Sequence, residues 1–182
     1  MKRIILLLAF FCISFSSSAQ IQTKFWGLEL SRRYLSLSQA KDIVSNKCKY
    51  VDIEENSIKA FDGVFGGYNW DFITFDFHKS TPVYSWTLYT TSFSSYHKNS
   101  EDAKRKYQLL QNSLTTKHGS PSLLERDDEL LSSWAGAESR IYCLLKYEKG
   151  MSRGGDMYFY VTLNYIDRDI LDLSVQQQES EL

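Results

Sequence analysis

Two stretches of strict alternation, joined by a short proline-containing turn, constrain the fold of this chain more than any other feature. Between residues 70 and 78, large apolar side chains stand at positions 73, 75 and 77, the pattern of a strand with one buried face. Residues 83–93 alternate in the same way, and Ser80, Thr81 and Pro82 separate the two runs. Because so short a connection cannot cross over a sheet, we expect the two strands to pair antiparallel.

The strongest helix signal covers residues 101–119. Asn99 or Ser100 can cap its first turn, and Gly119 is placed to end it. The helix carries one apolar stripe: Ala103, Tyr107, Leu110 and Leu114. Such a stripe indicates that one side of the helix packs on a sheet.

Weaker patterns complete the chain. They predict a short helix over 38–47 and strands over 57–61, 130–134, 140–147 and 157–165, with a polar connection over 123–131. The order is therefore helix, three strands, helix, three strands. We expect an α+β fold, an antiparallel sheet with two helices on one face. Two tandem units, 36–93 and 99–166, are one interpretation, and a single mixed sheet whose halves share no ancestry is the other.

The first nineteen residues have the pattern of a secretory signal peptide. Lys2 and Arg3 precede an apolar run of about ten residues, and Ser17 and Ala19 suit a cleavage site. We expect cleavage near Ala19, export to a periplasm or the cell exterior, and no transmembrane segment in the mature chain. Residues 20–174 would then form a single domain, and 175–182 a frayed tail.

The net charge and the aromatic content of the chain limit the classes of function to consider. The 21 basic and 22 acidic residues give a net charge of −1, which offers no general attraction to nucleic acid. Aromatic residues make up 15% of the chain. With the helices on one side of the sheet, the other side would carry a candidate binding face: Trp70, Phe72, Tyr89, Tyr142, Tyr158 and Tyr160. Alternatively, the chain ends cover this face, or its aromatics are cross-strand pairs on a solvated sheet.

Signals for catalysis are weak. Asp76 and His78 share one strand face and could offer a carboxylate and an imidazole to a metal, with His97 as a third ligand. The chain has no G-x-S-x-G turn, no G-x-G-x-x-G motif and no P-loop. We therefore expect no catalytic residue, no bound metal and no cofactor.

Two cysteines remain after the signal segment. Cys48 and Cys143 form a possible disulfide in an exported protein, or they are two buried thiols. The sequence leaves both interpretations open.

The order of elements resembles the β-lactamase-inhibitor-protein-like architecture, which small outer-membrane assembly lipoproteins share. The resemblance is carried by residues 39–47, 70–93, 101–119 and 140–165, and no specific motif accompanies it. It implies a concave sheet face that binds another protein. The lipoprotein members' lipidation motif is absent, because Cys12 lies inside the apolar run.

We therefore expect a secreted or periplasmic non-enzymatic module that uses the aromatic face to bind a protein or an envelope component. One alternative is a small envelope hydrolase or carbohydrate-active protein with a site near Asp76 and His78. The other is a structural envelope protein without a ligand.

Overall fold

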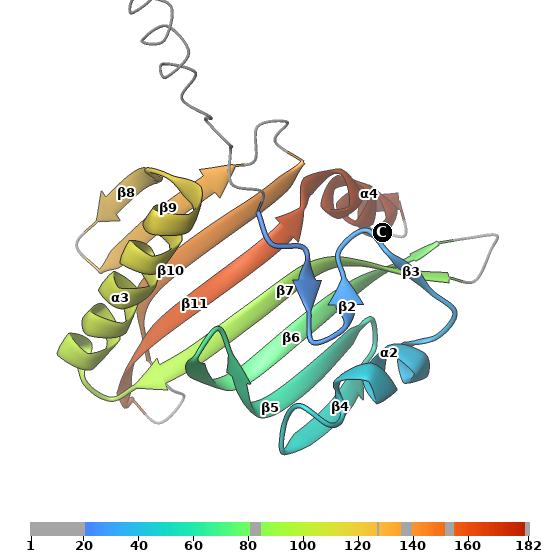
Figure 1. Cartoon of the computed structure of the whole chain (residues 1–182), viewed down its shortest axis with the longest axis horizontal. Helices are drawn as coiled ribbons and strands as arrows, with labels where there is room; N and C mark the ends of the chain where they lie inside the picture. The colour runs from blue at the N-terminus through green and yellow to red at the C-terminus, as the bar shows by residue number, and fades with distance from the viewer. Residues whose placement is uncertain (1–20, 81–84, 127, 136–139, 152–154, 181–182) are drawn as a thin grey trace, which may run out of the picture.

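The computed structural model describes residues 21–80, 85–126, 128–135, 140–151 and 155–180. In this part of the chain, the fold is α+β and is built on one nine-stranded antiparallel sheet (Figure 1). The strand order along the sheet is β4-β5-β6-β7-β11-β10-β9-β8, and the short β3 pairs with β7 beside this path. The expected signal segment, residues 1–19, lies outside the described residues.

The sheet consists of two meanders, each preceded by a helix. The first half contains α2 (Leu37–Val44), β4 (Tyr50–Glu54), β5 (Ser57–Phe65), β6 (Tyr68–Ser80) and β7 (Ser85–His97). The second contains α3 (Ser100–His118), β8 (Ser122–Arg126), β9 (Glu129–Ala135), β10 (Ile141–Met151) and β11 (Met157–Asp167). The last strand of each half, β7 and β11, pair antiparallel at the centre. Each half thus has four strands, one more than the alternation predicts, because β4 and β8 lie where no strand was expected.

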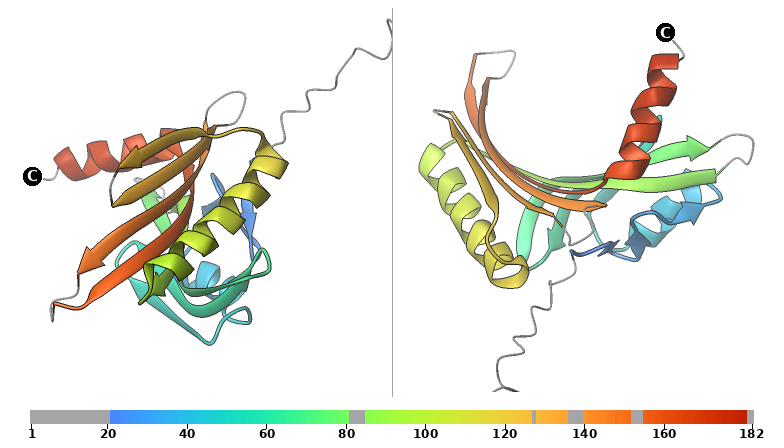
Figure 2. Two further views of the ribbon diagram at one scale, coloured as in Figure 1. Left: turned by 90° about the vertical axis from the view of Figure 1, so that its left-hand side faces the viewer. Right: turned by 90° about the horizontal axis from the view of Figure 1, so that it is seen from above.

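An N-terminal arm and two helices cover one face of the sheet (Figure 2). The arm contains β1 (Lys24–Phe25), β2 (Leu28–Glu29) and β3 (Arg33–Tyr34). Phe25 is fully buried, and its ring lies 5.6 Å from that of Phe65 and 4.8 Å from that of Tyr165. The arm therefore fills the part of the covered face that lies between α2 and α3.

Helix α3 follows the sequence prediction closely. The Asn99 side chain accepts a hydrogen bond of 2.7 Å from the Glu101 amide, and Gly119 takes a positive φ of 85° at the other end. All four residues of the predicted stripe are buried against the sheet: Ala103, Tyr107, Leu110 and Leu114. Capping and apolar periodicity agree here, so the helix is specified both locally and by its packing.

The prediction of a frayed C-terminal tail is wrong for the described residues. Helix α4 (Arg168–Ser180) continues through residues 175–180, where a frayed tail was predicted. The fully buried Asp167 accepts a hydrogen bond of 3.4 Å from the Ile170 amide and so caps its first turn. Helix α4 contacts β6, β7 and β11, and this packing stabilises a segment of weak sequence pattern.

Both cysteines of the described chain are free thiols, so the possible disulfide between Cys48 and Cys143 is not formed. Cys48 lies just before β4, whereas Cys143 lies on β10, and four strands separate β4 from β10. The two strands are therefore five strand spacings apart, roughly 24 Å at about 4.8 Å per spacing, well beyond the reach of a disulfide. Cys48 and Cys143 therefore lie at distant parts of one wide sheet.

None of the helices in the described ranges is both long enough and apolar enough to cross a membrane.

Candidate functional site

The second face of the sheet is concave and largely uncovered. Seen from above, α3, α2 and the arm lie below the curved sheet, while only α4 rises on the concave side of the described chain, near one end of the strands (Figure 2). Strand registers identify the side chains that share this open face, because directly paired residues point the same way. The open face is therefore the natural place to look for a binding site.

A row of aromatic side chains crosses five neighbouring strands of the open face. We name these residues the aromatic row: Tyr50, Phe61, Phe72, Tyr96 and Tyr160. Ring centroids lie 5.8 Å apart between Tyr50 and Phe61, and 5.2 Å apart between Phe72 and Tyr96. The Tyr96 and Tyr160 rings meet edge to face at 4.8 Å. These separations are typical of favourable aromatic pairs.

Two members of the aromatic row are exposed to solvent, and the other three are partly buried. Tyr50 is 58% exposed and Tyr96 is 44% exposed. The Lys59 ammonium lies 5.8 Å from the centre of the Phe61 ring and 5.2 Å from that of Phe72, so the row also carries a cation on its surface. Exposed tyrosines beside a cation form a surface of the kind enriched in binding hot spots.

Five of the six residues predicted for the open face lie on it. Phe72 and Tyr160 belong to the aromatic row, and Tyr158 is two residues before Tyr160 on β11. Tyr142 receives a hydrogen bond of 3.1 Å from Arg168, at the start of α4. Tyr89 lies under α4, where Ser174 contacts its hydroxyl group.

Trp70 is the exception, and its predicted place on the open face is wrong. It is only 2% exposed, and its indole donates a 3.1 Å hydrogen bond to the Phe65 carbonyl. The cause is a local irregularity: Asp62 has a positive φ of 53° on the paired strand. Ala60 and Gly63 consequently face the core three residues apart, and their partners Ile73 and Trp70 do the same.

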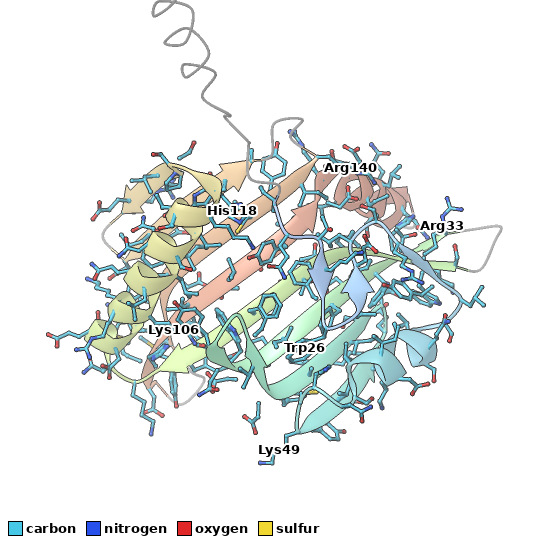
Figure 3. The ribbon with its side chains drawn as sticks, viewed as in Figure 1. Trp26, Arg33, Lys49, Lys106, His118 and Arg140 are labelled. Carbon is cyan, nitrogen blue, oxygen red and sulfur yellow. The ribbon has the colours of Figure 1, made fainter. Side chains whose placement is uncertain are left out.

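Contacts with Lys106 of α3 stabilise Trp70 in this buried position. Its ammonium lies 4.2 Å from the centre of the Trp70 ring and 2.6 Å from the Asn69 carbonyl oxygen, and it also contacts the Ser95 hydroxyl. Figure 3 shows Lys106 between α3 and the nearby ends of β6 and β7. Burial lowers the pKa of Lys106 to about 8.

Three members of the aromatic row were missed by the sequence prediction: Tyr50, Phe61 and Tyr96. Tyr96 could have been found, because the alternation of residues 83–93 continues through Ser92 and Ser94 to this position. Tyr50 gives no comparable signal, since its strand is short and exposed on most positions.

A polar strip lies beside the aromatic row, toward the middle of the open face. Its members are small hydroxyl and amide side chains on β6, β7 and β11: Thr74, Ser92, Ser94, Thr162 and Asn164. Next to it on β10, the Lys146 ammonium lies 2.7 Å from Glu148 and 3.2 Å from Glu129. The open face thus offers aromatic surface and hydrogen-bonding groups side by side.

A pocket of about 250 Å³ opens where the open face meets α4. The β4–β5 turn, β6, Tyr89 and α4 all contribute to its lining: Glu54, Glu55, Asn56, Ser57, Asp76, Phe77, Tyr89 and Ser174. Burial raises the pKa of the Asp76 carboxyl from its ordinary 3.8 to about 6. Burial, followed by the nearby Asp76 charge, also raises the pKa of Tyr89.

The candidate metal ligands do not converge. Asp76 lines the pocket, but His78 does not, and His97 lies at the opposite end of β7, paired with Phe159 of β11. Across the residues that the structure describes, no group of three His, Cys, Asp or Glu side chains could hold a metal ion.

Comparison with known proteins found no matching family model, no matching curated protein and no matching solved structure.

Proposed function

We propose that this protein is an exported, non-enzymatic binding module whose open face binds a protein or another component of the cell envelope. The observation that carries the proposal is the aromatic row, five rings on the concave side of the sheet, of which two belong to exposed residues and three to partly buried ones. Large rigid side chains contribute contact area at a low cost in conformational entropy, which favours their use at protein interfaces.

The contrast between the two faces supports this proposal. On the covered face, Phe25, Phe75 and Phe93 are completely buried, as expected of core residues. The aromatic row lies on the other side, where it adds nothing to that core. Cross-strand pairing alone would stabilise the sheet by about 0.2–1 kcal/mol per pair, and smaller β-branched residues could supply much of this.

Affinity capture from the cell-envelope extract of the source organism tests the proposal. The wild-type protein, from Gln20 onward, is compared with a Phe72→Ala/Tyr96→Ala/Tyr160→Ala variant and with Leu123→Ala, a change at an exposed residue on the edge strand β8. We expect the triple variant to lose the captured component and Leu123→Ala to retain it. Capture unaffected by the triple variant would contradict a role of the aromatic row, and no specific capture by any form would favour a structural protein without a ligand.

A small hydrolase or carbohydrate-active protein is a second candidate, supported by the pocket at Asp76. A carboxyl group with a pKa near 6 can act as a general acid near neutral pH. Turnover of chromogenic glycosides or esters that disappears in Asp76→Asn, with the fold intact, would favour this candidate over the binding module.

A further inference from the structure

The pocket at Asp76 has walls of two kinds. Tyr89 supplies ring surface, and the hydroxyl groups of Ser57 and Ser174 supply polar atoms. Phe77 borders the pocket, but its ring is 1% exposed and packs on Tyr34 in the core. Its volume of about 250 Å³ falls below the usual range for small-molecule sites, roughly 300–1,000 Å³. These dimensions suit one long side chain rather than a whole metabolite.

The charged residues that line the pocket are all acidic. Glu54, Glu55 and Asp76 line it, and among the described residues of its lining there is no lysine, arginine or histidine. Lys59, outside the lining, lies 3.8 Å from the Glu54 carboxylate and offsets one of these three charges, while its ammonium also lies over the rings of the aromatic row. Within the described residues, no hydrogen bond reaches the Asp76 carboxylate. Ionising a carboxylate that is only partly open to solvent is costly, and an entering cation would offset that cost.

The pocket belongs to the same face as the aromatic row. Phe72 and Asp76 both point to the open side of β6, four residues apart, where they pair with Ser94 and Thr90 of β7. At about 3.3 Å per residue, their separation along the strand is roughly 13 Å. An extended partner segment could therefore place one residue on the row and another, four positions away, in the pocket.

We propose that the Asp76 pocket receives a lysine or arginine side chain of the protein partner whose neighbouring residues lie on the aromatic row. This inference rests on the proposed function and adds the chemistry of the partner. The alkyl stem of the side chain would pack on Tyr89, while its cationic head would meet Asp76 and the flanking glutamates.

A fragment titration tests the pocket by itself. The probe is n-butylammonium, which reproduces the lysine side chain, and the matched neutral probe is n-butanol; binding is followed by amide chemical shifts in NMR. We expect saturable shifts around Glu55, Ser57 and Tyr89 with the ammonium, and affinity weaker by about tenfold for n-butanol or in Asp76→Asn. Asp52→Asn, which removes an exposed carboxylate from neighbouring β4, should leave the titration unchanged. Equal affinity for the two probes, absence of shifts, or no effect of Asp76→Asn would overturn the inference.

Capture from the envelope extract then connects the pocket with the partner. We expect Asp76→Asn to weaken capture of the same component that the aromatic variants lose. If the aromatic variants abolish capture but Asp76→Asn does not, the binding module stands and the cationic anchor is wrong. If the aromatic variants have no effect, the proposed function fails, and the fragment titration still decides whether the pocket accepts a cation.

Discussion

The guanidinium group of Arg140 holds the carboxylate of Asp167 in a fork. Arg140 Nε lies 3.2 and 3.1 Å from the two carboxylate oxygens, and Nη2 lies 2.9 Å from Oδ2. The same carboxylate accepts hydrogen bonds from the Ser31 hydroxyl and from the Ile170 amide. Asp167 therefore joins the N-terminal arm, the start of β10 and helix α4, and Figure 3 shows Arg140 beside that helix.

Replacing Arg140 should destabilise the protein substantially. Asp167 is fully buried, so Arg140→Ala leaves a buried carboxylate without its cation, and we expect a loss of about 3 kcal/mol in the free energy of unfolding. The half-exposed position of Arg140 places this figure at the low end for such pairs. Urea denaturation measures the loss. Lys49→Ala, which breaks an exposed ion pair with Asp62, should cost less than about 0.5 kcal/mol, and similar losses in both variants would contradict the role of Asp167.

Helix α3 has two adjacent leucines that differ in burial and can be compared by mutation. Leu110 is 3% exposed and its neighbour Leu109 is 53% exposed. Leu110→Ala should cost about 2–5 kcal/mol because it leaves a cavity against the sheet. Leu109→Ala should cost less than about 1 kcal/mol, since little of that side chain leaves water on folding. Chemical denaturation of both variants checks the orientation of the helix, and a reversed order would show that the helix faces the sheet differently.

Asp76 should make stability fall as the pH rises. The folded protein holds the Asp76 proton with a pKa of about 6, whereas the ordinary value is 3.8, so ionisation favours the unfolded chain. We expect a decrease of at most about 2 kcal/mol between roughly pH 4 and pH 6, after allowance for partial solvent exposure. Glu54, Glu55 and Tyr89 are the titratable groups that share its pocket.

Asp76→Asn separates this contribution from the rest of the titration curve. The variant should be more stable than the wild type at pH 8 and no more stable at pH 4, as measured by urea denaturation at both values. Parallel curves for the two proteins across this range would show that Asp76 is not buried as a carboxylate.

The two thiols should differ sharply in reactivity. Cys143 is fully buried and burial raises its pKa to about 12, so it should not react with a thiol reagent in the native protein. Cys48 is only half-buried and should react slowly, because burial raises its pKa as well. Under denaturing conditions without reductant, the chain from Gln20 onward should show two thiols. A smaller number would indicate a disulfide.

Export can be checked at the N-terminus. Expressed with its own first nineteen residues, the protein should be recovered from the periplasm or medium with Gln20 as its first residue. Mass spectrometry gives the answer directly, and recovery of the intact Met1 form from that fraction would contradict a cleaved signal segment.

Local sequence patterns correctly predicted the elements whose apolar side chains are buried in a regular spacing. The alternation of 70–78 and 83–93 led to β6 and β7, and the caps and stripe of 101–119 led to α3. Strand β8 was missed because all five of its residues are exposed, so pairing with β9 leaves no apolar pattern. Helix α4 was missed because its stability comes from the sheet and from the Asp167 cap.

The candidate site was predicted in outline through the same alternation. A period of two places Phe72, Tyr158 and Tyr160 opposite the core, and the structure agrees. Trp70 departs from it because the left-handed Asp62 interrupts the neighbouring strand, a feature that no period reveals. The Asp76 pocket needs the β4–β5 turn and α4 together, which only the tertiary fold brings into contact.

The pairing of β7 with β11 has a consequence for how the chain folds. Within each meander, every strand pairs with a strand next to it in sequence, so each half can assemble through local hairpins. The central pair instead joins residues 62 to 76 positions apart, from His97 with Phe159 to Thr90 with Ile166, and its formation should be the slow, entropically costly step. Cleavage between Lys98 and Asn99 would divide the molecule into two chains with complete sets of local hairpins. Mixed together, they should reassociate into the native sheet, whereas each alone would expose one side of an unpaired central strand.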